Sequence, residues 1–315
     1  MVHHIWVEKY RPTKLDDISS QDIIINMLKN VIHTKTIPHL LFYGPSGCGK
    51  TSTILALANE LFGETINTNR IIELNASDER GINIIRDKIK RYAKQIMNYN
   101  DKVPPWKLII LDEADTMTSD SQFALRRIME QYSKITRFCI ICNYHTKIID
   151  PIISRCSVFH FKPINNEHLI SKLEYICKEE KINYPKDLLI KIIELSRGDL
   201  RRAINFLQKC SGFININIDE VFGILPNNII DSIFTALYNK DIHKIDMIIN
   251  KLYNDGYSLV NQILVFHNRI LKMDINSYKK AQILHILGLI DHQLIKGSNE
   301  YILFMKLVYF IMKTI

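Results

Sequence analysis

One octapeptide restricts the fold of this chain more than any other stretch: GPSGCGKT, at residues 44–51. It follows the apolar run HLLFYG (39–44) and precedes a helix-like stretch at 50–62. Glycines in such a loop let backbone N–H groups turn inward around an anion, and the helix N-terminus adds a positive dipole end. Lys50 is placed to reach the outer phosphates of a nucleotide, and the Thr51 hydroxyl to bind Mg²⁺. The strand–loop–helix context predicts a P-loop that binds ATP or GTP. We assign nucleotide binding to Gly44, Pro45, Ser46, Gly47, Cys48, Gly49, Lys50, Thr51 and Ser52.

A second apolar run, KLIILDEA (107–114), ends in acidic residues. Asp112 should lie at the carboxyl edge of the sheet, where open α/β sheets bind ligands, and is a candidate Mg²⁺ ligand beside Thr51. Glu113 is placed to polarise a water toward a γ-phosphate. The alternative is that both acids only cap the next helix. Asn143 ends a later strand and either positions that water or is an ordinary turn residue.

The remaining apolar runs are IIELNA (71–76), RFCIICN (137–143) and SVFHF (157–161). They are continuous rather than alternating, which is typical of parallel strands buried on both faces. Helical stretches separate them, so we expect an α/β domain with a five-stranded parallel sheet covered by helices on both faces. In the sequence, 71–76 lies between the P-loop strand and the acidic strand. That order fits NTPases whose catalytic glutamate lies in the strand next to the P-loop strand.

After residue 163 the pattern becomes helix after helix, at roughly 166–180, 186–196 and 199–210. The stretch SGFININ (211–217) is typical of a linker, and the rest of the chain is again helical. We therefore predict an α/β domain at 1–163, a small helical domain at 164–214 and a helical C-terminal domain at 215–315.

The formal net charge of +8 suits an anionic partner such as nucleic acid, but a merely basic soluble protein has the same composition. We expect no secretory signal and no membrane contact. The C-terminal YILFMKLVYFIMKTI is too short and too charged to span a bilayer, and predicts a core-facing helix. The six cysteines are expected to be reduced. Cys139 and Cys142 form a CxxC within an apolar strand, which favours buried thiols over a metal site.

A basic helix is predicted in DERGINIIRDKIKRYAKQI (78–96). Its apolar side carries isoleucines at spacings of three, four and seven, namely Ile82, Ile85, Ile89 and Ile96. A different side carries basic residues every four positions, namely Arg86, Lys90 and Lys94, and Arg80 and Gly81 lie at the helix start. Such a face either is simply solvated or contacts DNA phosphates; nothing in it indicates base reading.

Eight segments stand in one family's order: WVEKYRP (6–12), PHLLFYGPSGCGKTST (38–53), ELNASDERG (73–81), LIILDEAD (108–115), ALRRIME (124–130), TRFCIICNY (136–144), SRC (154–156) and GDLRRA (198–203). The chain thereby resembles the small subunits of replication factor C, AAA+ ATPases of the eukaryotic and archaeal sliding-clamp loader. The resemblance covers roughly residues 5–210 strongly and the C-terminal helices more loosely. It is most similar to the type numbered two or four.

The resemblance implies roles for single residues. Val7 and Arg11 match positions that border the adenine and so favour ATP. Asn143 is similar to the sensor of the γ-phosphate, and Arg201 to a second sensor that reaches ATP from the helical lid. Arg155, in SRC, resembles an arginine finger that acts in trans on the ATP of a neighbouring subunit.

The family loop is commonly GPPGTGKT, whereas this chain has Ser46 and Cys48. Both fall at positions where the main chain does the binding, so we expect binding to survive. The thiol of Cys48 makes the site a candidate for alkylation. The helix start and Lys50 should lower its pKa, and burial should oppose this.

The resemblance also implies a function. The chain would be an ATPase subunit of a hetero-pentamer, with ATP and Mg²⁺ as cofactors, that loads a PCNA-type ring clamp on primer–template DNA during replication and repair in the nucleus. The helix at 78–96 would then line the DNA path. Arg126 and Arg127 are weaker DNA candidates that could equally pair with acids at a subunit seam. The amide of Gln122 is a candidate for coupling neighbouring subunits. The alternatives are an ATP-binding structural subunit with little turnover, and a homo-oligomeric AAA+ helicase-type motor.

Overall fold

The computed structural model describes residues 5–18, 20–63, 70–77, 82–95, 104–211, 223 and 225–315. The chain forms two compact units, Met1–Ser211 and Gly212–Ile315. The predicted linker at 211–217 lies outside the described residues except for Ser211. The predicted boundaries after residues 163 and 214 stay a prediction.

The first unit is built on a five-stranded sheet in the order β2-β3-β4-β1-β5, in which every pairing is parallel. The strands are β1 (His39–Tyr43), β2 (Ile71–Asn75), β3 (Lys107–Asp112), β4 (Thr136–Cys142) and β5 (Cys156–His160). This sheet confirms the predicted α/β fold class and each predicted strand to within about two residues.

The strand order corrects one expectation. The acidic strand β3 pairs with β2 and β4, so β4 separates it from the P-loop strand β1. Crossover connections allow a later strand to enter between two earlier ones, and chain order alone does not give spatial order. The expectation that the glutamate-bearing strand lies next to the P-loop strand was wrong.

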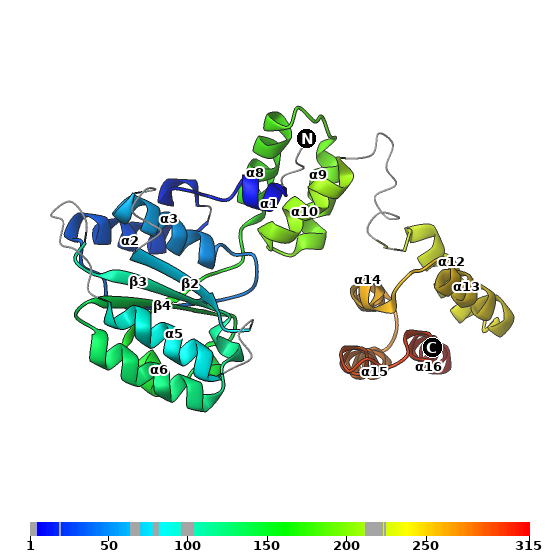
Figure 1. Cartoon of the computed structure of the whole chain (residues 1–315). Helices are drawn as coiled ribbons and strands as arrows, with labels where there is room; N and C mark the ends of the chain where they lie inside the picture. Colours follow the sequence, from blue (N-terminus) through cyan, green and yellow to red (C-terminus); the bar gives the residue numbers. More distant parts are fainter. Residues whose placement is uncertain are drawn as a thin grey trace. The chain divides into compact units, whose positions relative to one another are not determined.

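Helices cover both faces of the sheet (Figure 1). On one face lie α2 (Asp22–Thr34) and α3 (Lys50–Phe62), and on the other α5 (Ile82–Lys94) and α6 (Ser119–Tyr132). The apolar side chains of β3 alternate between the two cores, which is why the strand is a continuous hydrophobic run. Shorter elements are α1 (Trp6–Lys9), η1 (Leu15–Asp17), η2 (Ala114–Thr116), η3 (His145–Lys147) and α7 (Asp150–Ile153).

The first unit also tests the predictions for two helices and for the cysteines of β4. The helix expected at 50–62 is α3. The helix expected at 78–96 is described as α5, and residues 78–81 and 96 lie outside the described residues. Cys139 and Cys142 are buried in β4, as expected for thiols within a core strand.

Three helices complete the first unit: α8 (Asn166–Glu179), α9 (Lys186–Ser196) and α10 (Leu200–Cys210). They confirm the predicted helical segments. Asp199 caps α10 by accepting a hydrogen bond from the backbone N–H of Arg202 at 2.9 Å. The N-terminal helix α1 packs on α10, where the backbone N–H of Trp6 donates to Gln208 at 3.0 Å.

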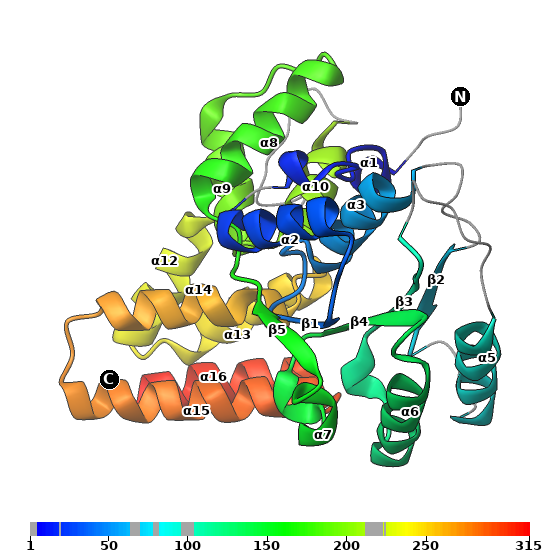
Figure 2. The same ribbon diagram turned by 90° about the vertical axis from the view of Figure 1, so that its left-hand side faces the viewer.

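The second unit is helical in its described part: α12 (Asn227–Tyr238), α13 (Ile242–Asn254), α14 (Leu259–Lys272), α15 (Ser277–Ile295) and α16 (Glu300–Thr314). Helix α15 lies against α14 and α16 (Figure 2). Helix α16 buries Leu303, Phe304, Leu307, Val308 and Ile311, which confirms the core-facing C-terminal helix. Among the described helices, none combines the length and apolar character needed to cross a bilayer.

Candidate nucleotide-binding site

The P-loop begins the site, between β1 and α3. Gly47 has φ +65° and Gly49, the N-cap of α3, has φ +96°, a left-handed region that favours glycine. A Cβ atom added to Gly47 would lie 1.8 Å from the carboxylate of Asp199. A residue with a Cβ would therefore displace this carboxylate, and the positive φ would strain its backbone.

Lys50 occupies the centre of the loop and is only 8% exposed. Its Nζ donates to the carbonyls of Gly44 and Pro45, both at 2.7 Å, and to the side-chain oxygen of Asn143 at 3.0 Å. Asn143 follows β4, and β4 pairs directly with β1. The sheet thus places the predicted sensor beside the predicted phosphate-binding lysine.

A hydroxyl and a carboxylate meet next to the loop. The Thr51 Oγ1 donates to the Asp112 Oδ2 at 2.7 Å, and Asp112 is the last residue of β3. Oxygen ligands of this kind are those that Mg²⁺ prefers, so the two residues fit the predicted metal site.

Glu113 follows with φ +53°, an uncommon conformation for a residue with a side chain. Its backbone N–H donates to the Asp112 Oδ1 at 2.8 Å, and its exposed side chain lines the pocket. This conformation turns the chain sharply after β3, and sparsely populated backbone geometry of this kind is concentrated at functional sites.

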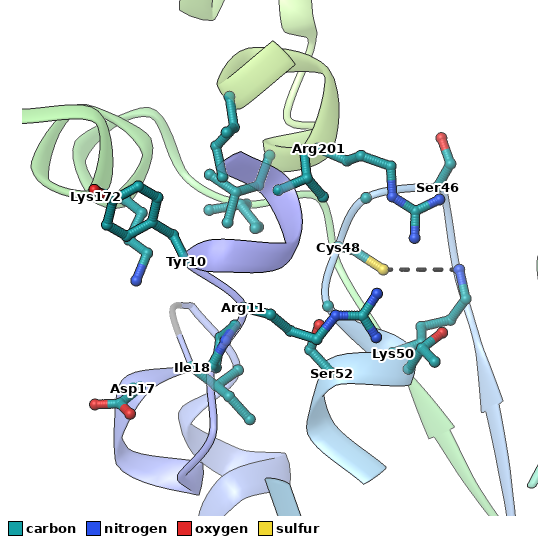
Figure 3. A pocket seen from close by; sticks show the side chains of 18 of the residues that line it. Tyr10, Arg11, Asp17, Ile18, Ser46, Cys48, Lys50, Ser52, Lys172 and Arg201 are labelled. Atoms are coloured by element: carbon teal, nitrogen blue, oxygen red, sulfur yellow. Dashed lines mark hydrogen bonds between the residues drawn. The ribbon is translucent and has the colours of Figure 1, made fainter. Parts of the chain in front are cut away.

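The far end of the pocket is formed by α1, α8 and α10 (Figure 3). Val7, Arg11 and Arg201 all line it, as the resemblance implied. Figure 3 shows Arg11 and Arg201 extending toward the side of the pocket that holds Lys50. Arg11 forms an ion pair with Glu8, in which the Glu8 Oε1 lies 2.6 Å from the Arg11 Nη2.

Sequence reasoning missed part of this lining: Tyr10, Pro12, Asp17, Ile18, Ile164, Lys172, Leu200 and Ile204. Tyr10, Pro12 and Leu200 lie within quoted motifs and Ile204 directly follows one, so motif membership was the signal available for them. Lys172 comes from the middle of α8, and no motif marked it. Burial lowers the pKa of Lys172, and the nearby Asp17 opposes this shift.

The loop also contacts the start of α10 directly. The hydroxyl of Ser46 donates to the Asp199 Oδ2 at 2.9 Å, and the backbone N–H of Leu200 donates to the Gly47 carbonyl at 3.2 Å. The helix that carries Arg201 therefore starts on the phosphate-binding loop itself.

Cys48 is buried within the loop, with an exposed fraction of 1%. Its thiol donates to the Pro45 carbonyl at 3.0 Å, and the Lys50 Nζ lies 3.9 Å from the sulfur. Burial raises the pKa of the Cys48 thiol, and the opposing effect of Lys50 is smaller. Of the two influences weighed from the sequence, burial dominates, so the expectation of alkylation sensitivity is not supported by the structure.

Arg155 lies after α7 and is not among the described residues that line the pocket. Its Nη2 forms an ion pair with the Glu130 Oε1 at 2.5 Å. Arg126 pairs with the same oxygen at 3.0 Å, so it has an acidic partner within its own chain.

Gln122 is only 2% exposed. Its amide donates to Lys147 at 2.9 Å and accepts from the Ile149 backbone at 2.9 Å. Both bonds lie within the chain, and the expectation that Gln122 couples neighbouring subunits stays a prediction.

Helix α5 has a buried side and a basic side in its described part. Ile89 and Ala93 are buried, whereas Lys90 and Lys94 are exposed, as the spacing predicted. The buried ammonium of Lys107 donates to the carbonyls of Tyr92 and Gln95 and so holds the end of α5 to β3. Arg80 and Gly81 and the side chains of Arg86, Ile82 and Ile85 lie outside what the structure describes.

Comparison with known families divides the chain into three parts. Residues 40–164 match the ATPase family associated with various cellular activities (AAA), and residues 171–211 match an RCF1/5-like, AAA+ ATPase lid domain. Residues 225–309 match the replication factor C C-terminal domain. The architecture is thus an AAA domain, an AAA+ lid and a helical C-terminal domain, as the sequence predicted. An AAA P-loop domain also implies that the chain binds a nucleotide.

Similar proteins cover nearly the whole chain. Replication factor C subunit 2 of Schizosaccharomyces pombe is 45% identical over 305 residues, which is 94% of this chain and 90% of that protein. Subunit 4 of Homo sapiens is 39% identical over 94% of this chain and 85% of that protein. The small subunit of Archaeoglobus fulgidus is 42% identical over 95% of this chain and 94% of that protein.

A solved structure shares the fold at low identity. The Thermotoga maritima RuvB Holliday junction branch migration motor aligns with a TM-score of 0.53 and 16% identity, and the match covers 72% of this chain and 79% of that one.

The burial of Cys48 generates a prediction for thiol chemistry. In the folded chain near neutral pH, we expect iodoacetamide to label Cys48 at least about tenfold more slowly than in the urea-unfolded chain, because the thiolate is scarce and covered. Peptide mass spectrometry after timed labelling measures the rate. Fast labelling of Cys48 with loss of ATP binding would show that the thiol is accessible and reactive.

Proposed function

This chain belongs to the replication factor C small subunits, the clamp loader of DNA replication, and we propose that it binds ATP with Mg²⁺ and hydrolyses it there. Its resemblance is to the type numbered two or four. One observation carries the proposal: Thr51 meets Asp112 at 2.7 Å while Lys50 meets Asn143 at 3.0 Å, beside a pocket that Glu113 lines.

The residues of the chain have separate tasks in the proposed reaction. Backbone N–H groups of the P-loop and the ammonium of Lys50 bind the phosphates. Thr51 and Asp112 would hold Mg²⁺, which would neutralise phosphate charge. Glu113 accepts a proton from the attacking water, and Asn143 orients that water.

The second half of the reaction involves two subunits. Arg201 reaches the phosphates of the same ATP from α10, which begins on the P-loop. Arg155 serves the ATP of a neighbouring subunit. Arg155 is not among the described residues that line its own pocket, and its side chain is 34% exposed; both observations support that role. A finger of this kind stabilises charge on the transferring phosphoryl group.

We propose the partners on the same basis. They are the other replication factor C subunits in a hetero-pentamer, a PCNA-type ring clamp, and primer–template DNA along α5. The parts 1–163, 164–214 and 215–315 would act as ATPase domain, lid and collar. ATP binding shifts the populations of assembly states, and no bond in the DNA is made or broken. The eukaryotic relatives favour residence in the nucleus.

Two other functions are weaker. An ATP-binding subunit with little turnover would not need Glu113 beside a complete Thr51 and Asp112 pair. A homo-oligomeric helicase-type motor has the likeness to RuvB in its favour, but at 16% identity that likeness reports the fold alone. Robust strand unwinding by the purified chain would support the motor.

Replacing the proposed base tests the reaction. In a reconstituted loader in which only this subunit's site keeps its P-loop lysine, we expect Glu113→Gln to lower ATP hydrolysis roughly 100-fold or more and to leave ATP binding intact. Glu167→Gln, an exposed change on α8, is the matched control. Hydrolysis at the control rate in Glu113→Gln would favour the structural-subunit alternative.

Removing basic side chains tests the DNA contact. We expect Lys90→Ala/Lys94→Ala to weaken DNA-stimulated hydrolysis and to lower the slope of log affinity against log salt by about 1.8, since each lost phosphate contact removes about 0.9. ATP binding should be unchanged. The control is Lys244→Ala/Lys251→Ala, which alters exposed lysines of α13. Equal DNA affinity in both double variants would contradict a role for α5.

A further inference from the structure

The guanidinium of Arg155 is held by acceptors of its own chain. Its Nη2 lies 2.5 Å from the Glu130 Oε1. Its Nη1 donates to the Pro151 carbonyl at 2.6 Å and lies 3.4 Å from the Ser154 hydroxyl. A guanidinium has five N–H donors in a rigid plane, so these contacts fix its orientation and leave donors for an acceptor outside the chain.

Glu130 is itself constrained. It lies in the last turn of α6, where its Oε1 also accepts from the Nε of Arg126 at 3.0 Å. The hydrogen bond from Arg126, together with the charges of Arg126 and Arg155, lowers the pKa of Glu130. The two arginines therefore favour the charged form of the carboxylate, which is the form that holds Arg155.

The two elements that carry this pair are tied together by buried bonds. Gln122, on α6, bonds to Lys147 and Ile149 at 2.9 Å each, and Ile149 is the N-cap of α7. Arg155 follows α7 directly. The hydrogen bonds of Gln122 thus hold α6 and α7 together, and with them the backbones that carry Glu130 and Arg155.

We propose that Glu130 is a positioning residue for Arg155: it holds the guanidinium in one orientation so that the neighbouring subunit's ATP meets a prearranged finger. The proposal rests on the trans role of Arg155 proposed above. An arginine loses much rotamer freedom when it binds, and a side chain already ordered by its own chain loses less. Exposed ion pairs contribute little to folding, so the pair is better explained by orientation than by stability.

The test uses a reconstituted loader in which hydrolysis is competent only at the neighbouring site that faces Arg155. We expect Glu130→Ala to lower kcat there about tenfold with KM unchanged, because small misplacement of a catalytic group is costly. Glu130→Gln keeps an acceptor oxygen and should restore part of the rate. Gln131→Ala, an exposed change one residue away, is the matched control.

Two further variants test whether Glu130 acts through Arg155. Arg155→Ala and Glu130→Ala/Arg155→Ala should have the same kcat, because Glu130 acts only through Arg155. Additive losses, a rate equal to that of Gln131→Ala, or a rate above wild type in Glu130→Ala would each overturn the positioning role. If Arg155→Ala itself leaves the neighbouring site unchanged, the trans role is wrong and the Glu130 proposal is wrong with it.

Discussion

The hydrogen bond between Thr51 and Asp112, 2.7 Å long, joins the P-loop helix to the acidic end of β3. The P-loop follows β1, and β1 is not a neighbour of β3 in the sheet, because β4 lies between them. The contact is possible because parallel strands present their carboxyl ends at one edge, so that the residues after β1, β3 and β4 face the same space. Lys50 and Asn143 complete that edge. The site is therefore a direct consequence of strand direction and strand order.

In the proposed function, the residues around this edge serve two nucleotides. The loop, β3 and β4 would bind the chain's own ATP, and Arg201 would contact it from α10, whose start is hydrogen-bonded to Ser46 and Gly47. Helix α6 follows the acidic segment and reaches Glu130, which contacts Arg155. In the proposed assembly, the segment from Asp112 through α6 thus connects the metal-binding edge of one site with the finger that serves the next.

The sequence predicted the parts of the fold that depend on local pattern. Continuous apolar runs gave all five strands, and the loop pattern gave the start of α3 at Lys50. Strand order could not be predicted from the sequence, because the hydrophobic pattern of one strand does not specify which strand pairs with it. The prediction that placed the glutamate strand beside β1 failed for that reason.

The site was predicted unevenly. Lys50, Thr51, Asp112 and Asn143 followed from where each strand ends, and the structure brings them together. Whether burial or Lys50 dominates the pKa of Cys48 could not be predicted without knowing how buried the thiol is. The hydrogen bonds of Gln122 within the chain could not be predicted without the fold of the segment before α7.

Other parts of the site carried less local signal. Lys172 lines the pocket from the middle of α8. The sequence of α8 showed only a helical pattern and no motif that marked a binding residue. The trans role of Arg155 came from family resemblance alone, because no property of a single chain encodes what it does to another.

In the proposed function, the nucleotide site is complete only between subunits. This requirement is tested most directly by single-turnover hydrolysis of ATP with Mg²⁺, measured for the purified chain alone and for the same chain in the reconstituted loader with DNA and clamp. We expect the lone chain to bind ATP but to hydrolyse it on the order of 10³-fold more slowly, the scale of a missing arginine finger. Equal rates in the two preparations would contradict a shared site.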